Sequence, residues 1–220
     1  LLRVNNSTTD LRKVIDGALL LSEGRRTEAN ALIAGDVPLS WDGVFCGPER
    51  IVPWLTSLVS KAVAIQEWQA LCNSSMLLKS KVQLSSLLRP QTFLNALRQE
   101  TSHLTREPLV SLKLISTIGT PPTNAALPVC LSGLLLQGAV IDDSGVLSEI
   151  QAADAAAFFP MPDVYVAWVM DVEAKPTDVA IPTYVNATKE ALVTEFTLPA
   201  ATAGDVERFV LAGISIMLEQ

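Results

Sequence analysis

Few side chains in this sequence are of the types that carry catalysis. A serine-type triad needs a histidine as its base, and His103 is the single histidine of the chain, flanked by Ser102, Leu104 and Thr105. His103 falls at the expected C-terminal end of a helix, where the helix dipole favours a cation. We therefore interpret His103 as a structural residue, and a hydrolase that uses it is the weaker alternative.

The glycine spacing of a phosphate-binding loop occurs in Gly133-Leu134-Leu135-Leu136-Gln137-Gly138. Such a loop needs a Lys followed by Ser or Thr for phosphate and magnesium, whereas here Ala139 and Val140 follow. The glycines are better interpreted as positions that permit a bend or bulge between two strands. We expect no nucleotide to bind this segment.

Metal-ligand spacing is also missing. Zinc sites use Cys and His in short pairs, but Cys46, Cys72 and Cys130 lie far from one another and from His103. The odd number and wide spacing of the cysteines favour buried, reduced thiols over a disulfide framework. Asp142 and Asp143, followed by Ser144 and Gly145, predict a turn. The expected catalytic, cofactor-binding and metal-binding residues are therefore none.

The composition indicates a sizeable core and a surface that something else covers. The chain has 220 residues, enough for one large domain or two small ones. Hydrophobic residues make up 49% and charged residues 18%, which is apolar for a freestanding protein. A surplus of this kind is typical of a domain with a hidden interface.

The charge and hydropathy patterns exclude several partners. The net charge of -7 argues against nucleic acid and against an anionic membrane, because both require clustered Lys and Arg. No segment reaches the roughly 20 apolar residues that span a bilayer. The N-terminal residues lack a signal-peptide pattern, so a reducing compartment is expected.

The first half of the sequence has helical periodicity. An apolar stripe with spacings of three and four predicts an imperfect helix from the N-caps Thr9 and Asp10 to Gly35, broken near Gly24. Residues 53–68 predict a strong helix that starts with Pro53 in its first turn, with Trp54 and Trp68 as core aromatics. A third helix begins at Pro90.

From about Leu109 the pattern changes to short apolar runs separated by Gly, Pro, Asp and Asn. Exposed loops are expected at residues 120–126 and 171–178. Strands are predicted at 109–117, 128–135, 137–142, 164–169, 181–187, 193–198 and 209–217. Without helices between them, these strands favour a small barrel or sandwich. The predicted fold class is α+β, with a helical subdomain at 1–108 followed by a small antiparallel β-barrel at 109–220.

Five motifs, in this order, resemble the C-terminal domain of dynein heavy chains. They are Val37-Pro38-Leu39-Ser40-Trp41, the Trp-bearing helix from Trp54 to Trp68, Pro90-Gln91-Thr92-Phe93-Leu94, Gly133-Leu134-Leu135-Leu136-Gln137-Gly138-Ala139 and Pro182-Thr183-Tyr184-Val185-Asn186-Ala187-Thr188. The segment Phe93-Leu94-Asn95-Ala96-Leu97-Arg98-Gln99-Glu100-Thr101 further resembles the cytoplasmic dynein of retrograde intraflagellar transport.

The resemblance implies a non-catalytic domain that lies across one face of the AAA+ ring of the same heavy chain and modulates processivity and force. ATP, magnesium and the coiled coil would then belong to other parts of the parent, a minus-end-directed microtubule motor ATPase. The resemblance also implies a dimeric parent with intermediate and light chains. Its expected location is the cytoplasm, the cytoskeleton and a cilium or flagellum.

One alternative follows from the barrel prediction itself. A β-barrel of this size can enclose a small apolar ligand, so the second half could be an independent binding module. A ligand retained in native mass spectrometry would favour that alternative, whereas association with AAA+ ring modules would favour the motor domain.

Overall fold

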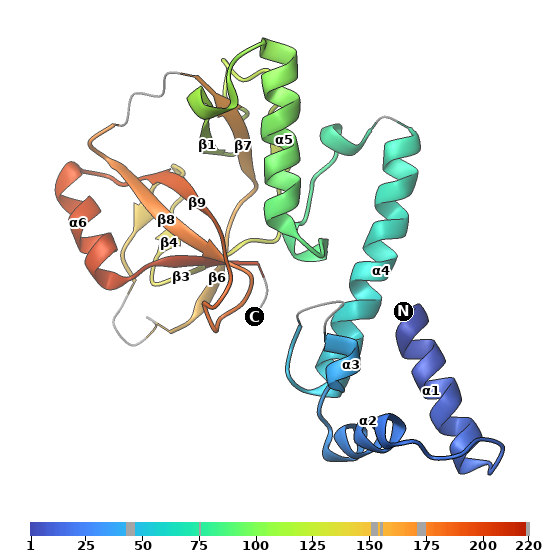
Figure 1. The fold of residues 1–220 in the computed structure, drawn as a ribbon. Helices are drawn as coiled ribbons and strands as arrows, with labels where there is room; N and C mark the ends of the chain where they lie inside the picture. Colours follow the sequence, from blue (N-terminus) through green and yellow to red (C-terminus); the bar gives the residue numbers. More distant parts are fainter. Residues whose placement is uncertain (43–46, 75, 151–153, 155, 171–174, 219–220) are drawn as a thin grey trace. The chain divides into compact units, whose positions relative to one another are not determined.

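The computed structural model divides the protein into two compact units, Leu1–Glu67 and Trp68–Gln220 (Figure 1). It describes residues 1–42, 47–74, 76–150, 154, 156–170 and 175–218. The boundary between the units falls inside one continuous helix, α4 (Ile51–Asn73).

The first unit consists of helices α1 (Leu2–Ile15), α2 (Glu23–Ala34), α3 (Leu39–Asp42) and most of α4. The predicted end at Gly35 is confirmed, since Gly35 has φ 79° and its N–H donates to the last turn of α2. The predicted start at Thr9 was wrong, because α1 begins at Leu2, whereas the predicted break near Gly24 is confirmed, because the chain leaves the helix shortly before this residue. The break spans residues 16–22, and Ser22 caps α2 by accepting from the Arg25 N–H, which places Gly24 inside the helix.

The core of this unit is small. Trp41, Trp54 and Leu58 are the buried residues of its hydrophobic cluster, and the centroids of the two indole rings lie 6.0 Å apart. The predicted role of Trp54 as a core aromatic is confirmed. The predicted apolar stripe is not buried throughout, because Ile15 and Ile33 are 85% and 84% exposed. Helical periodicity therefore predicted the helices but not which apolar residues are covered.

In the second unit, α5 (Pro90–Thr105) begins at Pro90 as predicted. Leu94 and Leu97 are buried against the strands. The Trp168 indole Nε1 donates to the Leu94 carbonyl oxygen at 3.0 Å, and the Arg98 guanidinium lies 4.8 Å from the Trp168 ring centroid. Arg98 also donates to the carbonyl oxygens of Leu109 and Leu112, so one side chain fixes the segment that leaves α5.

The strands form three sheets in the described residues. The first has the order β1-β7-β2, the second β6-β3-β10-β8-β9, and the third is the pair β4-β5. All pairs are antiparallel except β10 with β8. The bounds are β1 (Lys113–Ile118), β2 (Val129–Leu131), β3 (Leu135–Gln137), β4 (Val140–Ile141), β5 (Leu147–Ser148), β6 (Phe158–Pro160), β7 (Val164–Val169), β8 (Asp178–Tyr184), β9 (Leu192–Pro199) and β10 (Ser215–Met217). A mixed fold with helices first is confirmed, and these ladders do not form a closed barrel within the described part of the sequence.

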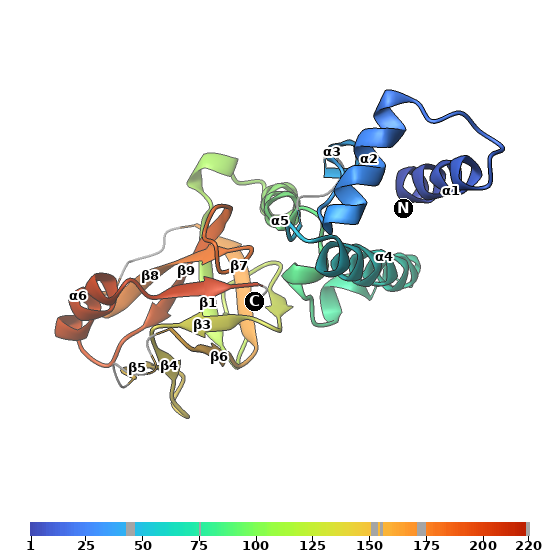
Figure 2. The ribbon, with the colours of Figure 1, turned by 90° about the horizontal axis from the view of Figure 1, so that it is seen from below.

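The predicted strand at 209–217 was wrong in its first half. That segment contains the end of helix α6 (Ala203–Ala212), which packs against β8 (Figure 2), and only then β10. Thr202 and Asp205 form a reciprocal capping box, and Gly213 ends the helix with φ 68°. The expectation of strands without intervening helices fails for this reason. Residues 109–111 are likewise a short 3-10 helix, η3 (Leu109–Ser111), instead of strand. Two further short 3-10 helices, η1 (Leu77–Lys79) and η2 (Leu84–Ser86), precede α5.

Three other strand predictions hold, whereas the strands predicted at 128–135 and 137–142 are divided into β2, β3 and β4 by the bends at Gly133 and Gly138. The strand predicted at 164–169 matches β7, and β8 and β9 overlap the predictions at 181–187 and 193–198. Most of the predicted loop at 120–126 is irregular in structure. Residues 171–174 of the other predicted loop lie outside the described residues.

The side chain of Ser116 joins the two larger sheets. Its hydroxyl donates to the Thr197 carbonyl oxygen and accepts from the Thr197 N–H at 2.9 Å, so β1 lies beside β9. One hydroxyl therefore satisfies two polar backbone groups of β9.

Replacing Ser116 with Ala should lower the free energy of unfolding by about 1–3 kcal/mol, because it leaves the half-buried N–H and carbonyl of Thr197 unpaired. Urea denaturation measures this. The control is Thr117→Ala, whose hydroxyl bonds an exposed loop carbonyl at Thr120 and should cost less. Equal losses for the two variants would show that Ser116 does not join the sheets.

Candidate functional site

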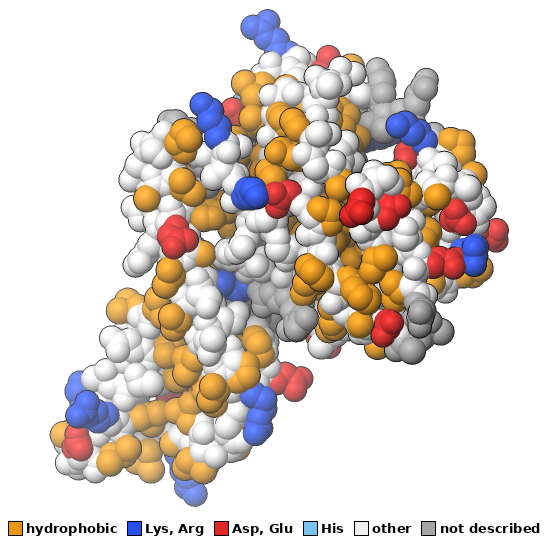
Figure 3. All heavy atoms as spheres, turned by 180° about the vertical axis from the view of Figure 1, so that it is seen from behind, with side chains coloured by type: hydrophobic (Ala, Val, Ile, Leu, Met, Phe, Trp, Pro, Cys, Tyr) orange, Lys and Arg blue, Asp and Glu red, His pale blue; other side chains and the backbone are white. Residues whose placement is uncertain are grey.

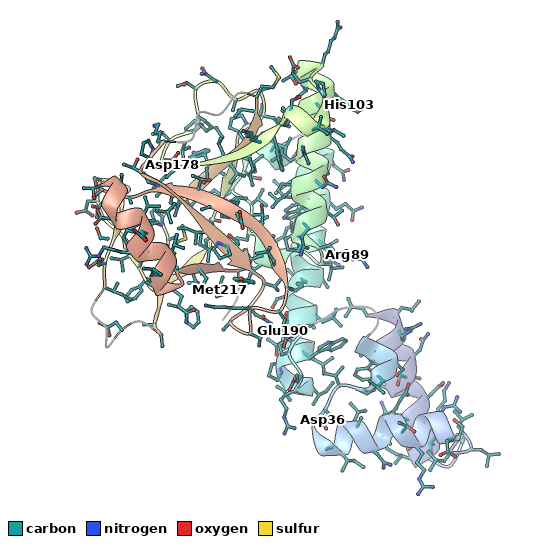
Figure 4. The ribbon with its side chains drawn as sticks, turned by 60° about the vertical axis from the view of Figure 1, so that its left-hand side comes forward. Asp36, Arg89, His103, Asp178, Glu190 and Met217 are labelled. Atoms are coloured by element: carbon teal, nitrogen blue, oxygen red, sulfur yellow. The ribbon has the colours of Figure 1, made fainter. Side chains whose placement is uncertain are left out.

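His103 lies in the last turn of α5 and is exposed (Figure 4). The hydroxyls near it are already engaged by the backbone. Ser102 Oγ donates to the Glu107 carbonyl oxygen at 2.6 Å, and Thr105 Oγ1 donates to the Thr101 carbonyl oxygen at 2.8 Å. A triad needs a hydroxyl that donates to the histidine, so this arrangement supports the structural interpretation of His103.

The glycine-spaced segment is a strand with a sharp bend at each end. Gly133 and Gly138 have φ values of 75° and 85°, in the left-handed region. Between them β3 pairs with β6 on one side and β10 on the other. Because its backbone groups are used in these ladders, they are not free to cradle a phosphate. The prediction of bends between strands is confirmed.

Cys130 belongs to a cluster of ionisable groups at the edge of the β1-β7-β2 sheet. Lys81 forms an ion pair with Asp163 at 2.6 Å, and Tyr165 pairs with Cys130 across β2 and β7. The hydrogen bond and charge of Asp163 raise the pKa of Lys81. Burial, followed by the charge of Asp163, raises the pKa of Cys130, and the neighbouring Cys130 raises the pKa of Tyr165. Near neutral pH the cluster thus holds a protonated lysine, a thiol and a phenol, with no activated nucleophile.

The prediction of buried thiols holds for one cysteine. Cys130 is buried, whereas Cys72 is exposed, and both are free. Cys72 lies in the last turn of α4, where Asn73 and Ser74 are exposed as well. Cys46 lies outside the described residues. Within the described residues, no group of three or more His, Cys, Asp or Glu side chains is arranged to hold a metal ion.

Asp142 organises the turn between β4 and β5, as predicted for this segment. Its carboxylate accepts from the Ser144 N–H at 2.9 Å, the Ser144 hydroxyl at 2.6 Å and the Val146 N–H at 3.0 Å. These bonds, that of the Ser144 side chain first, lower the pKa of Asp142. The carboxylate therefore fixes the hairpin rather than facing a substrate.

This pKa shift predicts a pH dependence. A carboxyl group whose pKa is lowered by folding contributes stability above its unfolded pKa of about 3.9, and that stability is lost as the pH falls through the folded value. The melting temperature of Asp142→Asn should therefore lie below that of the parent near pH 7, and the two should converge below about pH 4. Thermal unfolding followed by circular dichroism between pH 3 and 7 measures this, with Asp143→Asn as the control. A gap that persists at low pH would contradict it.

An open groove of about 530 Å³ lies between α1 and α2. Its charged groups are engaged with their neighbours: Arg25 pairs with Asp10 at 3.1 Å, and the Ser7 hydroxyl donates to Glu28 at 2.6 Å. A ligand would have to displace these contacts. Among the described helices, none is long and apolar enough to cross a bilayer.

The described residues thus form a first unit of helices and a second unit of sheets with helices. The family model for the C-terminal domain of dynein heavy chains matches residues 1–218. The protein belongs to this family of dynein domains, as its motifs predicted.

Particular heavy chains resemble it over nearly its whole length. It is 33% identical to cytoplasmic dynein 2 heavy chain 1 of Mus musculus over 98% of its residues, and 33% identical to the protein of that name from Chlamydomonas reinhardtii over 94%. Dynein axonemal heavy chain 9 of Homo sapiens is 24% identical over 98%. The sequence spans 5% of the length of each of these relatives.

Proposed function

We propose that this domain packs on the AAA+ ring of the same heavy chain and modulates the processivity and force of a minus-end-directed microtubule motor. The observation that carries the proposal is the family match over residues 1–218. ATP and magnesium would bind in the motor modules of the parent, a motor ATPase, and this domain would hold no reaction centre.

The relatives support a role in retrograde intraflagellar transport. The cytoplasmic dynein 2 heavy chains match with 32–33% identity in mouse and human, and 33% in Chlamydomonas reinhardtii. We infer that the parent works in the cytoplasm, on the cytoskeleton and in a cilium or flagellum. We further infer that it is dimeric, with intermediate and light chains as partners.

The surface fits a domain that is covered in its assembly. Figure 3 shows hydrophobic side chains spread over the face it displays. In the first unit Leu2, Leu20, Ile33 and Leu39 are each at least three-quarters exposed. Large apolar side chains in water mark an interaction surface when they are this numerous.

We also propose that residues 109–220 close into one barrel, which follows a helical subdomain of residues 1–108 in the sequence. The Ser116 hydroxyl bonds support this by joining the β1 and β9 edges. The interior of this unit is filled by fully buried side chains, including Leu131, Val164, Ile181 and Leu198. Filling by protein side chains leaves the alternative of a ligand-binding barrel without support.

A domain that tunes a motor must contact the ring differently in different states, because equal contact in all states shifts no equilibrium. We therefore expect the purified domain to bind the AAA+ ring of its own heavy chain with an affinity that depends on the bound nucleotide. Fluorescence anisotropy with the ring in ADP and in ADP with vanadate measures this. A ring that binds the domain equally in both states would contradict the tuning role, and no binding would contradict the packing role.

A further inference from the structure

Helix α4 is apolar on two opposite sides. On one side Trp54 and Leu58 enter the core of the first unit. On the other side lie Val52, Val59 and Val63, which are 70%, 53% and 50% exposed. Each residue of an α-helix is rotated by about 100° around the helix axis from the one before it. The spacings of seven and four therefore place the three valines within about 40° of one another around the axis of α4. A helix that is hydrophobic all round is typical of one that is covered all round.

These three residues, which we call the valine row, could be covered without burying a charge. Thr56, Gln66 and Ala70 lie on the same side and are uncharged; the exposed Glu67, one turn after Val63, lies at the margin of the row, where its carboxylate can stay in water. The Thr56 hydroxyl donates to the Val52 carbonyl oxygen at 3.0 Å, so it needs no water molecule as a partner. Short β-branched side chains also allow the axis of a second helix to approach to about 8–10 Å.

We propose that the valine row is the docking surface for an apolar helix from the remainder of the same heavy chain. In the matched dynein 2 heavy chains the corresponding segment is 5% of the polypeptide, so most of such a polypeptide lies outside it and is available as the partner. The valine row carries no charge that could pair with a charged loop, so burying a charged loop against it would be unfavourable. The apolar face of a helix can be buried against it without this cost. This inference rests on the proposed function and adds the surface and the kind of partner.

Burial of the row can be measured in the complete heavy chain. Val63→Cys should react with a maleimide at least about tenfold more slowly than Ile65→Cys, because thiol reactivity requires access. Ile65 is 44% exposed, close to the 50% of Val63, and lies on the opposite side of α4, so it is the matched control. Peptide mass spectrometry separates both sites from the native cysteines. Equal labelling rates at the two positions would overturn the proposal.

The partner is identified by a photo-reactive amino acid at Val59 of the complete heavy chain. We expect cross-links to an apolar helix of the same polypeptide outside residues 1–220. Cross-links within residues 1–220, or between two heavy chains, would overturn the proposal. Val63→Cys could be freely labelled while the affinity of the domain for the AAA+ ring still depends on the bound nucleotide. In that case the valine row is not the docking surface, and the proposed function stands.

Discussion

Replacing Trp54 with Ala should unfold the first unit and leave the second folded. Trp54 is 1% exposed and is one of the three side chains that form the buried core of that unit. Removing a buried tryptophan costs about 3–5 kcal/mol, and a core this small has little left to offset the loss. Amide hydrogen exchange should show α1, α2 and the first half of α4 losing protection, while β7 to β9 keep theirs.

The control for this prediction is Ile33→Ala on α2. Ile33 is an apolar residue of the same unit but is 84% exposed, so its truncation should change stability by less than about 0.5 kcal/mol. Loss of protection in β7 to β9 by Trp54→Ala would show that the two units do not unfold separately. Retained protection throughout would show that the Trp41–Trp54 pair is not the core of the first unit.

Replacing Gly138 with Ala should cost about 2–4 kcal/mol, from two sources that add. The first is the backbone, because φ 85° is unfavourable for any residue with a Cβ atom. The second is space, because that Cβ atom would lie 3.1 Å from Ile214 Cγ2 and 3.4 Å from Ile214 Cα. Ile214 is buried and the closest backbone belongs to the turn into β10, so the neighbour has little room to move.

Gly119→Ala separates the two sources. Gly119 has φ 73°, but nothing lies within 4 Å of the Cβ atom that alanine would add. It should therefore lose only the backbone contribution of about 1–2 kcal/mol. Guanidinium denaturation of both variants measures the difference. If Gly138→Ala costs no more than Gly119→Ala, the close packing of β3 against β10 is not present in solution.

Local chemistry made much of the fold predictable. Three features could be predicted because a few residues of the right type dictate the backbone geometry. They are the start of α5 at Pro90, the end of α2 at Gly35 and the strand at 164–169. The family followed from five motifs in order along the sequence. Signals of this kind depend on neighbouring residues and need no knowledge of the rest of the fold.

The errors came from competing signals and from tertiary packing. Helix α6 was missed because Val206, Phe209 and Val210 have the composition of a strand, although Thr202 and Asp205 carried a capping signal. The exposure of Val59 and Ile33 could not be predicted, because periodicity reports an apolar side and not what covers it. The Ser116 hydroxyl bonds that join β1 to β9 could not be predicted, because no sequence pattern distinguishes this serine.

The role of this domain in the motor is tested most directly by the output of single motors with and without it. The complete heavy chain and a version lacking residues 1–218 would be compared in an optical trap for stall force and run length. If the domain contacts the ring differently in the different states of the ring, both stall force and run length should change. The purified domain alone should hydrolyse no ATP. Unchanged stall force and run length, or ATP turnover by the domain itself, would contradict this role.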